Sequence, residues 1–251
     1  MDIRACTAIV SGAASGLGLA TATKLASGGA RVVAIDLEAS AALTQLGGRV
    51  HFVAADVTDD EAVKDAVDLA NLEGSLRIAV NCAGIVGRTR RTVGKEGLFP
   101  LDEFSRVLNV NLVGCFNVLR HCAGAMASNG VVGEERGVIV NTASIAGFDG
   151  QIGQAAYAAS KAGIIGMTLP IARDLAELRI RVMTIAPGLF QTPILDFVPE
   201  DLRKDLAAQA PHPARLGVPD EFAALVRAII ENPMLNGETI RLDGAIRMGP
   251  R

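Results

Sequence analysis

The sequence predicts an α/β fold: a doubly wound domain with helices on both faces of a mostly parallel sheet. Short apolar runs rich in Val and Ile alternate with helical stretches of about ten residues or more. The apolar runs are continuous, which is typical of strands buried on both faces. No repeat or linker interrupts the chain, so residues 1–251 are expected to form a single domain.

Seven apolar runs are expected to form the strands of this sheet. The predicted strands span residues 7–10, 31–35, 51–54, 77–80, 138–141, 181–185 and 238–242. Because helical stretches separate most of them, the strands are expected to run parallel, as in successive βαβ units.

Five longer helices are predicted between these strands. They span residues 17–26, 59–71, 101–127, 157–174 and 220–231, and residues 101–127 are expected to form one helix or two. Gly28 and Gly29 end the first helix. Thr58 and the three acidic residues that follow it provide a cap and an acidic first turn for the second.

Three polar segments interrupt the alternation of strands and helices. Residues 87–100 form an insertion loop with four basic residues, and residues 129–136 form a second loop. Residues 190–213 hold four prolines around a short helical patch. Because this segment joins a strand to a helix and has few apolar anchors, we expect it to be a mobile substrate lid.

Composition excludes several classes of protein. Hydrophobic residues make up 50% of the chain and charged residues 20%, which excludes disorder as the main state. The net charge of −3 gives no support for a protein that binds nucleic acid or a membrane surface. Four cysteines without CxxC spacing and three histidines without HxxxH spacing predict neither a disulfide framework nor a metal site.

Residues 5–23 carry no charge, so a signal peptide or a membrane helix has to be considered. The stretch contains Gly12, Gly16, Gly18 and five Ser or Thr residues, and it divides into a short apolar run and a glycine-rich turn. We therefore reject both alternatives and expect a soluble, cytoplasmic protein.

The glycine-rich turn follows the first predicted strand and precedes the first helix. Its glycines, Gly12, Gly16 and Gly18, have the spacing GxxxGxG. Glycines at such a turn allow close approach of the backbone to a pyrophosphate, and the helix points its N-terminal amides and dipole at that group. The turn therefore predicts a dinucleotide site.

Asp36 ends the second strand and indicates which dinucleotide binds. A carboxylate at this position accepts hydrogen bonds from an adenosine ribose and repels a 2′-phosphate. Ala13, Ala14 and Leu37 supply no positive charge to offset that repulsion. The sequence therefore favours NAD over NADP.

Tyr157 and Lys161 are four residues apart on a predicted helix and share one face. A cation beside a phenol favours the ionised form, which makes a general acid/base for an alcohol–ketone couple. Ser144 follows a predicted strand, where its hydroxyl group could polarise a substrate oxygen. Tyr157 is the only tyrosine in the chain.

Together these motifs resemble the short-chain dehydrogenase/reductase family. The segment formed by Asn81, Cys82, Ala83 and Gly84 is similar to the NNAG motif of that family, with Cys82 in place of the second Asn. The motifs occur in the family's order over essentially the whole chain. The resemblance implies a Rossmann-type fold in which Ser144 orients the substrate, Tyr157 transfers the proton and Lys161 supports both Tyr157 and the nicotinamide ribose. It also implies that Asn111 completes a proton relay through water.

Four longer runs resemble the type 2 3-hydroxyacyl-CoA dehydrogenases, also called 17β-hydroxysteroid dehydrogenases type 10. These runs are residues 154–157, 166–174, 182–190 and 240–248, and the insertion at 87–100 has the same place in that subfamily. The combined resemblance implies a cofactor site made of Gly12, Ser15, Gly16, Leu17, Gly18, Asp36, Asp56, Val57, Asn81, Cys82, Ala83, Gly84, Tyr157, Lys161, Pro187, Gly188, Phe190 and Thr192.

The substrate side and the assembly follow from further features. Gln151 and Gln154 precede Tyr157, and we expect them to contact substrate together with Ser144 and Tyr157. The basic residues of 87–100 are candidates for the phosphates of a CoA thioester or for a solvated loop. Residues 156–169 are apolar or small on almost every side, which favours a helix buried by another copy of the chain. The resemblance implies a homotetramer.

The predicted reaction is the reversible oxidation of a (3S)-3-hydroxyacyl-CoA to the 3-oxoacyl-CoA with NAD, which would place the enzyme in fatty acid metabolism and β-oxidation. A hydroxysteroid or other secondary-alcohol dehydrogenase is the alternative on the same machinery. A reductase of 3-oxoacyl carrier protein would normally require a basic residue near the adenosine ribose. A non-catalytic NAD-binding scaffold would have no use for the proton relay.

Overall fold

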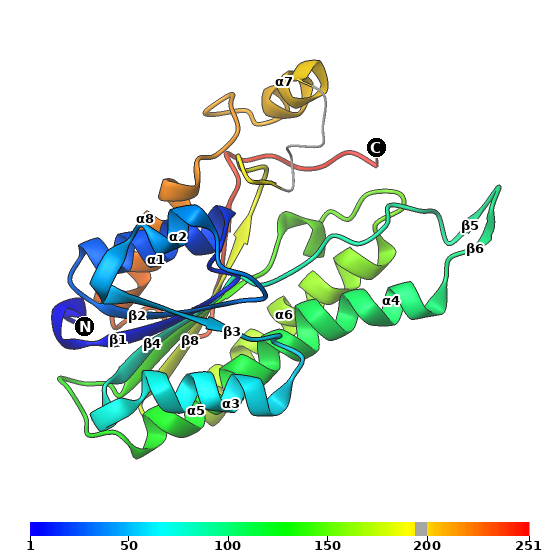
Figure 1. The fold of residues 1–251 in the computed structure, drawn as a ribbon. Coiled ribbons are helices and arrows are strands. Elements are labelled where there is room, and N and C mark those ends of the chain that lie inside the picture. The colour runs from blue at the N-terminus through cyan, green and yellow to red at the C-terminus, as the bar shows by residue number, and fades with distance from the viewer. Residues whose placement is uncertain (194–199, 251) are drawn as a thin grey trace.

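A seven-stranded parallel sheet lies at the centre of the computed structural model, which describes residues 1–193 and 200–250 (Figure 1). The strand order is β3-β2-β1-β4-β7-β8-β9. From β1 the chain first winds toward the β3 edge and then returns to build the other half toward β9. This order confirms the predicted doubly wound α/β fold.

The strands of the sheet lie close to their predicted positions. They are β1 (Thr7–Ser11), β2 (Arg31–Asp36), β3 (Val50–Ala54), β4 (Leu76–Asn81), β7 (Gly137–Thr142), β8 (Ile180–Pro187) and β9 (Thr239–Leu242). Every residue of β1, β4, β7 and β8 is buried, which explains the continuous apolar runs in the sequence.

The longer predicted helices are also present. The α-helices are α1 (Gly16–Ser27), α2 (Ala41–Thr44), α3 (Asp60–Ala70), α4 (Leu101–Leu108), α5 (Gly114–Ser128), α6 (Ala155–Asp174), α7 (Glu200–Ala208) and α8 (Pro219–Glu231). The predicted cap of α3 is confirmed, since the Asp59 carboxylate accepts a hydrogen bond from the amide of Ala62 at 3.1 Å. Within the stretch predicted as one or two helices, a π-helical turn, Asn109–Val113, joins α4 to α5.

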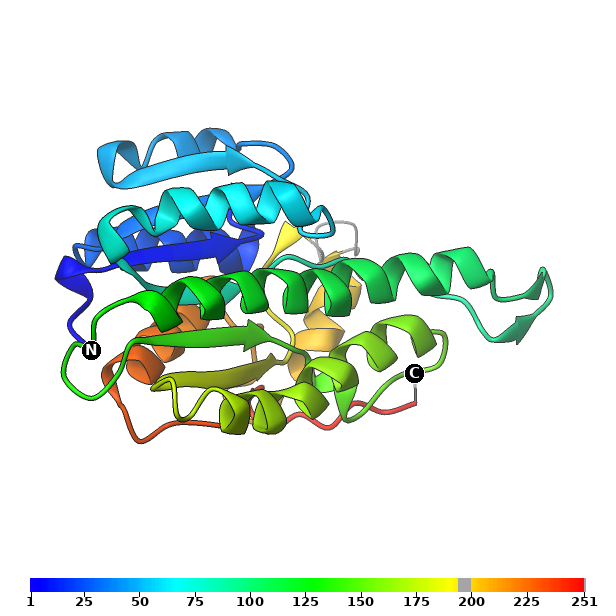
Figure 2. The same ribbon diagram turned by 90° about the horizontal axis from the view of Figure 1, so that it is seen from below.

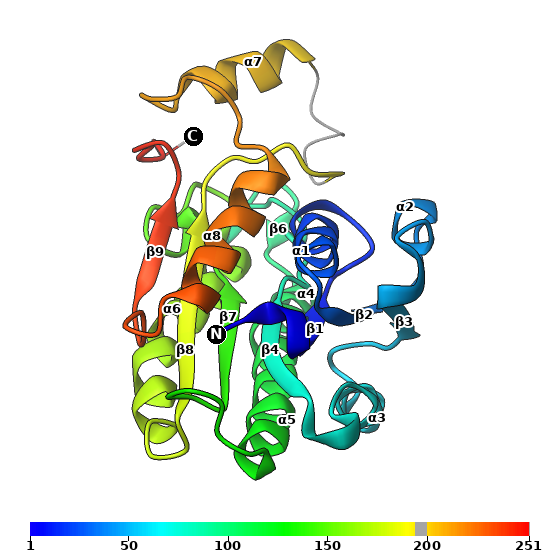
Figure 3. The same cartoon turned by 90° about the vertical axis from the view of Figure 1, so that its left-hand side faces the viewer.

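Helices cover both faces of the sheet (Figures 1 and 3). Helices α1 and α8 pack together on one face, and α3, α5 and α6 lie on the other. Along β1, the side chains of Ala8 and Val10 enter the first core while that of Ile9 enters the second. Successive side chains of a strand point to opposite faces, so one short run fills both cores.

The insertion at 87–100 contains a small antiparallel hairpin that the sequence did not predict. Its strands are β5 (Val93–Gly94) and β6 (Gly97–Leu98). The hairpin extends away from the sheet beside the start of α4 (Figures 1 and 2). Val93 and Leu98 are largely exposed there.

The predicted lid at 190–213 falls partly outside the described residues, since 194–199 are not among them. The described part contains α7, and the backbone of Phe190 pairs with that of Gly217. Movement of this segment remains a prediction. No helix within 1–193 and 200–250 has both the length and the apolar character required to cross a bilayer.

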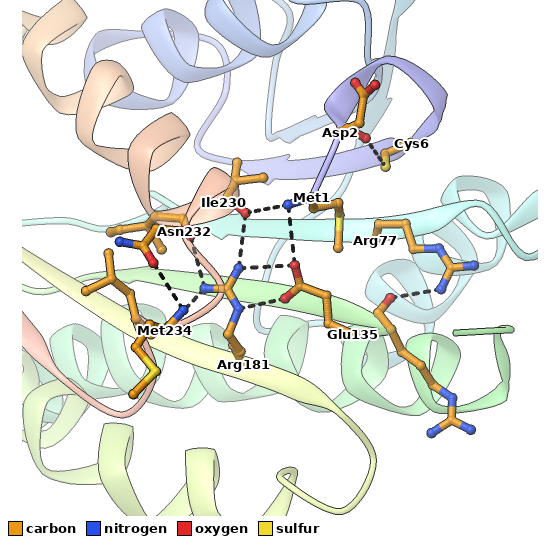
Figure 4. Close-up of polar contacts among 12 residues, drawn as sticks. Met1, Asp2, Cys6, Arg77, Glu135, Arg181, Ile230, Asn232 and Met234 are labelled. Atoms are coloured by element: carbon orange, nitrogen blue, oxygen red, sulfur yellow. Dashed lines mark hydrogen bonds and ion pairs between the residues drawn. The ribbon is translucent and has the colours of Figure 1, made fainter. Parts of the chain in front are cut away.

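A buried ion pair closes the end of the sheet where the strands begin (Figure 4). Arg181, near the start of β8, donates a hydrogen bond from Nε to a carboxylate oxygen of Glu135 at 2.6 Å. The same guanidinium group also donates to the carbonyl oxygens of Ile229, Ile230 and Leu235. The guanidinium group of Arg181 thus connects the loop before β7 to the end of α8.

Candidate active site

A cavity of about 890 Å³ lies at the other end of the sheet, where the central strands end. Its walls include residues that follow four adjacent strands, namely Gly12, Cys82, Ser144 and Gly188. The chain reverses its winding direction between β1 and β4. Open α/β sheets bind their ligands at this kind of switch point.

The glycine-rich turn borders the cavity and depends on missing side chains. Gly12 has a φ of +66°, and a Cβ atom on it would lie 2.6 Å from the backbone nitrogen of Ala83. A Cβ atom on Gly18 would collide with the carbonyl oxygen of Gly12. Without side chains at Gly12 and Gly18, the turn packs closely against the segment after β4. Helix α1 begins at Gly16, and both Gly16 and Leu17 line the cavity. The arrangement suits a pyrophosphate at the helix N-terminus.

Asp36 is held at the cavity wall by two backbone amides. Its carboxylate accepts hydrogen bonds from Ala14 at 2.9 Å and from Leu37 at 2.8 Å. The first bond ties the end of β2 to the glycine-rich turn. Among the described residues, the basic side chains that line the cavity are Lys161, which comes from α6, and Arg106, which comes from α4. This geometry fits a ribose with free hydroxyl groups.

Most of the predicted cofactor residues line this same cavity. They are Gly12, Ser15, Gly16, Leu17, Gly18, Asp36, Asp56, Val57, Cys82, Ala83, Gly84, Tyr157, Lys161, Pro187, Gly188, Phe190 and Thr192. Residues that come from six separate parts of the sequence are therefore brought together at one edge of the sheet.

Asn81 differs from the other predicted cofactor residues because its side chain lies beneath the cavity. It is 3% exposed, and its amide donates to Oδ1 of Asn141 at 2.9 Å. Ser11 lies within 3.4 Å of both Oδ1 of Asn81 and the amide of Ala83, which lines the cavity. Asn81 therefore supports the cavity wall from below.

Tyr157 and Lys161 both line the cavity from α6, as their spacing predicts. The Lys161 ammonium group lies 5.7 Å from the centre of the Tyr157 ring. Lys161 is 4% exposed and donates a hydrogen bond to the carbonyl oxygen of Thr142 at 2.9 Å. An ammonium group has three donors, so two remain for the phenol and a ribose.

Ser144 follows β7 and faces the same cavity. Its Oγ accepts a hydrogen bond from the amide of Ala146 at 3.1 Å and caps a short 3₁₀ turn. A hydroxyl group that accepts this bond keeps its own proton for donation to another oxygen. Gly147 packs this turn against α6, since a Cβ atom there would lie 3.0 Å from the backbone nitrogen of Ala162.

Asn111 lies in the π-helical turn and is completely buried. Its side chain donates to the carbonyl oxygen of Ile85 and accepts from the amide of Ile85, each at 2.8 Å. It also donates to Oγ of Ser160 at 3.0 Å, so it joins the cavity wall at Ile85 to α6. The water-mediated relay through Asn111 remains a prediction. Single π-helical turns between α-helical segments occur frequently at functional sites.

Gln151 and Gln154 line the cavity on the side expected for substrate. The amide of Gln154 donates to Oε1 of Gln151 at 3.4 Å. Oε1 of Gln154 is buried and has no hydrogen-bond partner among the described residues, so it is available to accept a bond from a ligand. Within the part of the chain that the structure describes, no group of three or more His, Cys, Asp or Glu residues could hold a metal ion.

Several lining residues were not among the predicted site residues. They include Ile85, Val86, Thr89, Arg106, Asn109, Leu189 and Met248. These residues lie in loops, in α4, in the π-helical turn and in the C-terminal segment. Local spacing cannot reveal that such segments meet at one cavity.

The chain matches the family described as short chain dehydrogenase over residues 6–203. It is 55% identical to the 3-hydroxyacyl-CoA dehydrogenase type-2 of Bos taurus, with 99% of this chain and 98% of that protein covered. The Drosophila melanogaster protein of the same name is 52% identical, with 99% and 100% covered.

A solved structure has the same fold over almost the entire chain. The crystal structure of 3-hydroxyacyl-CoA dehydrogenase type-2 from Mycobacterium avium superimposes with a TM-score of 0.95. Its sequence is 44% identical, with 99% of this chain and 98% of that chain covered. The Rossmann-type fold and the resemblance noted in the sequence are thereby confirmed. Taken with the cavity and its tyrosine, lysine and serine, these similarities establish that the chain belongs to the short-chain dehydrogenase family and is an NAD-dependent oxidoreductase.

Proposed function

We propose that this chain is an NAD-dependent 3-hydroxyacyl-CoA dehydrogenase that interconverts a (3S)-3-hydroxyacyl-CoA and the 3-oxoacyl-CoA. The observation that carries the proposal is that Ser144, Tyr157 and Lys161 line one cavity with the glycine-rich turn and Asp36. The relatives named 3-hydroxyacyl-CoA dehydrogenase type-2, which match along the full chain, support the substrate class.

Some residues of the cavity bind the cofactor, and others transfer the proton or position the substrate. Gly12, Gly18 and Asp36 would hold NAD, whose nicotinamide ring would supply the acceptor for the hydride that leaves the substrate carbon. In the oxidation direction, the ionised phenol of Tyr157 takes the proton of the substrate hydroxyl group. Ser144 donates a hydrogen bond to the same substrate oxygen and thereby fixes its position.

Lys161 and Asn111 act around that proton transfer. The two remaining donors of the Lys161 ammonium group serve the Tyr157 oxygen and the nicotinamide ribose. Because Lys161 is buried, its charge acts on these groups with little screening by water. Asn111 holds the Ile85 segment against α6 and so keeps the cavity wall in place.

The substrate enters beside Gln151 and Gln154. The buried, unpaired Oε1 of Gln154 suits an N–H group such as the amides of the CoA arm. The exposed basic residues Arg88 and Arg91 flank the segment of the insertion whose Thr89 lines the cavity, and in this proposal they bind the phosphates of CoA.

A secondary-alcohol dehydrogenase of another specificity, such as a hydroxysteroid dehydrogenase, is the second candidate. The observation in its favour is that Ile85, Val86 and Met248 give the substrate side of the cavity an apolar lining. Such a lining also suits a bulky apolar alcohol. A non-catalytic scaffold is disfavoured, since it would not require a buried lysine beside a tyrosine in the cavity.

The assembly and cellular setting form part of the same proposal. Val113, Phe116 and Leu169, on the helical segments of one face, are 52%, 46% and 44% exposed. Exposed apolar side chains on one face support the expected homotetramer, in which contacts between copies would bury them. Four free cysteines are consistent with a reducing compartment such as the cytoplasm. The proposed reaction belongs to β-oxidation in fatty acid metabolism.

The test is a panel of substrates followed by NADH absorbance. We expect turnover of acetoacetyl-CoA with NADH and of (3S)-3-hydroxybutyryl-CoA with NAD, and little turnover of the (3R) isomer. Hydroxysteroids and simple secondary alcohols are assayed in parallel, with Tyr157→Phe as the inactive control. Preference for a steroid or a simple alcohol over every acyl-CoA would favour the second candidate, and absence of turnover on the whole panel would exclude both.

A further inference from the structure

The C-terminal segment 243–250, which we call the tail, turns back from β9 toward the active-site loop 145–154. Gly244 and Ala245 have φ values of +60° and +66°, and the amide of Ala245 donates to Oδ1 of Asp243 at 3.0 Å. In Figure 2 the tail, drawn in red, runs from β9 toward the start of α6. The chain therefore reverses sharply after β9 instead of leaving the molecule.

Two hydrogen bonds fasten the end of the tail to the active-site loop. The amide of Ile152 donates to the carbonyl oxygen of Pro250 at 3.0 Å. The side chain of Gln151 donates to the carbonyl oxygen of Gly249 at 3.3 Å. Because Gln151 also accepts from Gln154, the tail is linked to both glutamines of the substrate side.

Arg241 clamps the beginning of the tail to the same loop. Its guanidinium group donates to a carboxylate oxygen of Asp243 at 2.7 Å and to one of Asp149 at 2.7 Å. It also donates to the carbonyl oxygen of Ile246 at 3.0 Å and lies 5.0 Å from the centre of the Phe148 ring. A planar guanidinium group fixes several partners at once, which an ammonium group cannot do.

Met248 lies between these two attachments and lines the active-site cavity. The next two residues along the tail bond to Gln151 and Ile152, which places Met248 at the substrate side rather than the adenosine side. Its side chain is unbranched and flexible, and it can adapt to apolar groups of different size.

We propose that Met248 is a specificity-determining residue that contacts the acyl part of the substrate, and that Arg241 is a positioning residue that holds Met248 in the wall. The acyl identity of the substrate rests on the proposed function. The placement of Met248 at the substrate side of the cavity does not depend on the proposed function. A shorter side chain at position 248 should enlarge the substrate side of the cavity, and a longer or stiffer one should narrow it.

The test measures kcat and KM for acetoacetyl-CoA and for 3-oxodecanoyl-CoA in Met248→Ala, Met248→Phe and Arg241→Gln. In Met248→Ala the KM for acetoacetyl-CoA should rise about tenfold, since a short acyl group loses its apolar contact, while the longer chain fills the vacated space. Met248→Phe should impair the longer substrate more than the shorter one. Met234→Ala, whose side chain is 89% exposed and lies outside the cavity, is the matched control and should match the wild type.

The positioning role of Arg241 is tested by non-additivity. Arg241→Gln should change the ratio of kcat/KM between the two substrates in the same direction as Met248→Ala. The double variant should then be no more altered in this ratio than Met248→Ala alone. An unchanged ratio in both Met248 variants would overturn the proposal. Equal losses for both substrates in Arg241→Gln would show that Arg241 only stabilises the fold.

These outcomes are separable from failure of the proposed function. If the wild type reduces no acyl-CoA but oxidises simple secondary alcohols, the same variants are compared on a small and a bulky alcohol. A shift of that ratio in Met248→Ala would uphold the role of Met248 although the acyl-CoA assignment had failed. Normal activity of the wild type on acyl-CoA, together with unchanged substrate ratios in the Met248 variants, would uphold the proposed function and overturn the role of Met248.

Discussion

The two ends of the central sheet use buried cations differently. At the end where the strands begin, Arg181 donates to Glu135 and to three carbonyl oxygens, and Arg77 donates to the carbonyl oxygens of Gly74, Gly130 and Arg136. At the end where they finish, Lys161 is just as buried but donates only to Thr142 among the described residues. Burial is similar at both ends, whereas the number of partners is not.

This difference separates structural charges from functional ones. The guanidinium group of Arg181 uses all its donors to hold segments together, so it has none left for a ligand. A buried cation with free donors beside a cavity is an incomplete site that a ligand completes. Unused hydrogen-bonding capacity at the wall of the cavity, rather than burial alone, therefore identifies Lys161, Ser144 and Gln154 as functional residues.

Removing the phenol at the cavity end should give the largest effect. Tyr157→Phe keeps the ring and removes one hydroxyl group, so kcat should fall by about 10² to 10⁴ while NAD still binds and the fold persists. Steady-state kinetics, NAD titration and circular dichroism measure these three properties. Near-normal turnover with an intact fold would mean that Tyr157 has a structural role and that the proposed mechanism is wrong.

Breaking the ion pair at the opposite end should change stability instead. Arg181→Met leaves Glu135 buried without its main partner, and we expect a loss of about 3–5 kcal/mol in the free energy of unfolding. Urea unfolding at one fixed protein concentration measures this loss. The double variant Arg181→Met with Glu135→Leu should recover much of it, with the kcat of the folded protein close to that of the wild type. A double variant as unstable as the single one would show that the carbonyl contacts of Arg181 matter more than the pair.

Asp36 should show an intermediate effect that concerns the cofactor alone. The wild type should prefer NAD over NADP by at least about tenfold in kcat/KM, because the carboxylate repels a 2′-phosphate. Asp36→Ala removes the repulsion and also the bond to the amide of Ala14, so it should use NAD less well and narrow the preference. Kinetics with both cofactors measure the ratio, and equal values in the wild type would contradict the assignment.

The alkylation rates of Cys82 and Cys115 test which of these buried thiols faces the cavity. Burial raises the pKa of the Cys82 thiol to about 11 and that of Cys115 to about 12. Alkylation of Cys82 should therefore be slow near neutral pH and accelerate about tenfold per pH unit below its pKa. NAD should protect Cys82, which lines the cavity, several-fold more than Cys115, which does not. Peptide mass spectrometry compares the two rates, and equal protection would imply general tightening of the fold.

An exposed pair provides the smallest effect. The pKa of Glu221 is lowered to about 2, mainly by hydrogen bonds from the Arg215 guanidinium group and, to a smaller extent, by one from the amide of Val218. A folded-state pKa below the unfolded value stabilises the protein above about pH 4.5, and the stabilisation is lost as the pH falls through the folded value. Because both side chains are close to half exposed, Glu221→Gln should cost less than about 1 kcal/mol near neutral pH.

Unfolding of the wild type and Glu221→Gln across this acidic range measures that difference. It should shrink as the pH falls from about 4.5 to about 2. A difference that is constant with pH would mean that the carboxylate charge of Glu221 contributes nothing to stability. A loss as large as that of Arg181→Met would contradict the distinction between exposed and buried pairs.

Much of the fold and of the site was predictable because it depends on short-range patterns. The apolar runs of β1 and β4, the spacing of Gly12, Gly16 and Gly18, and the single turn between Tyr157 and Lys161 are all properties of neighbouring residues. The hairpin of β5 and β6 escaped prediction because its strands have two residues each and no apolar periodicity. The resemblance implied that Asn81 belongs to the cofactor site, but no local pattern could show that its side chain bonds to Asn141 and Ser11, which come from other strands.

The sequence by itself determined the order of strands and helices along the chain, the glycine-rich turn, the acidic residue at the end of β2 and the tyrosine and lysine of α6. Only the tertiary structure decided that Arg181 meets Glu135 and that Met248 enters the cavity from a tail bonded to Gln151 and Ile152. The physical reason is that periodicity and turn preference act between neighbours in the chain. Partners of a buried charge and the walls of a cavity are set by packing between segments that are distant in sequence.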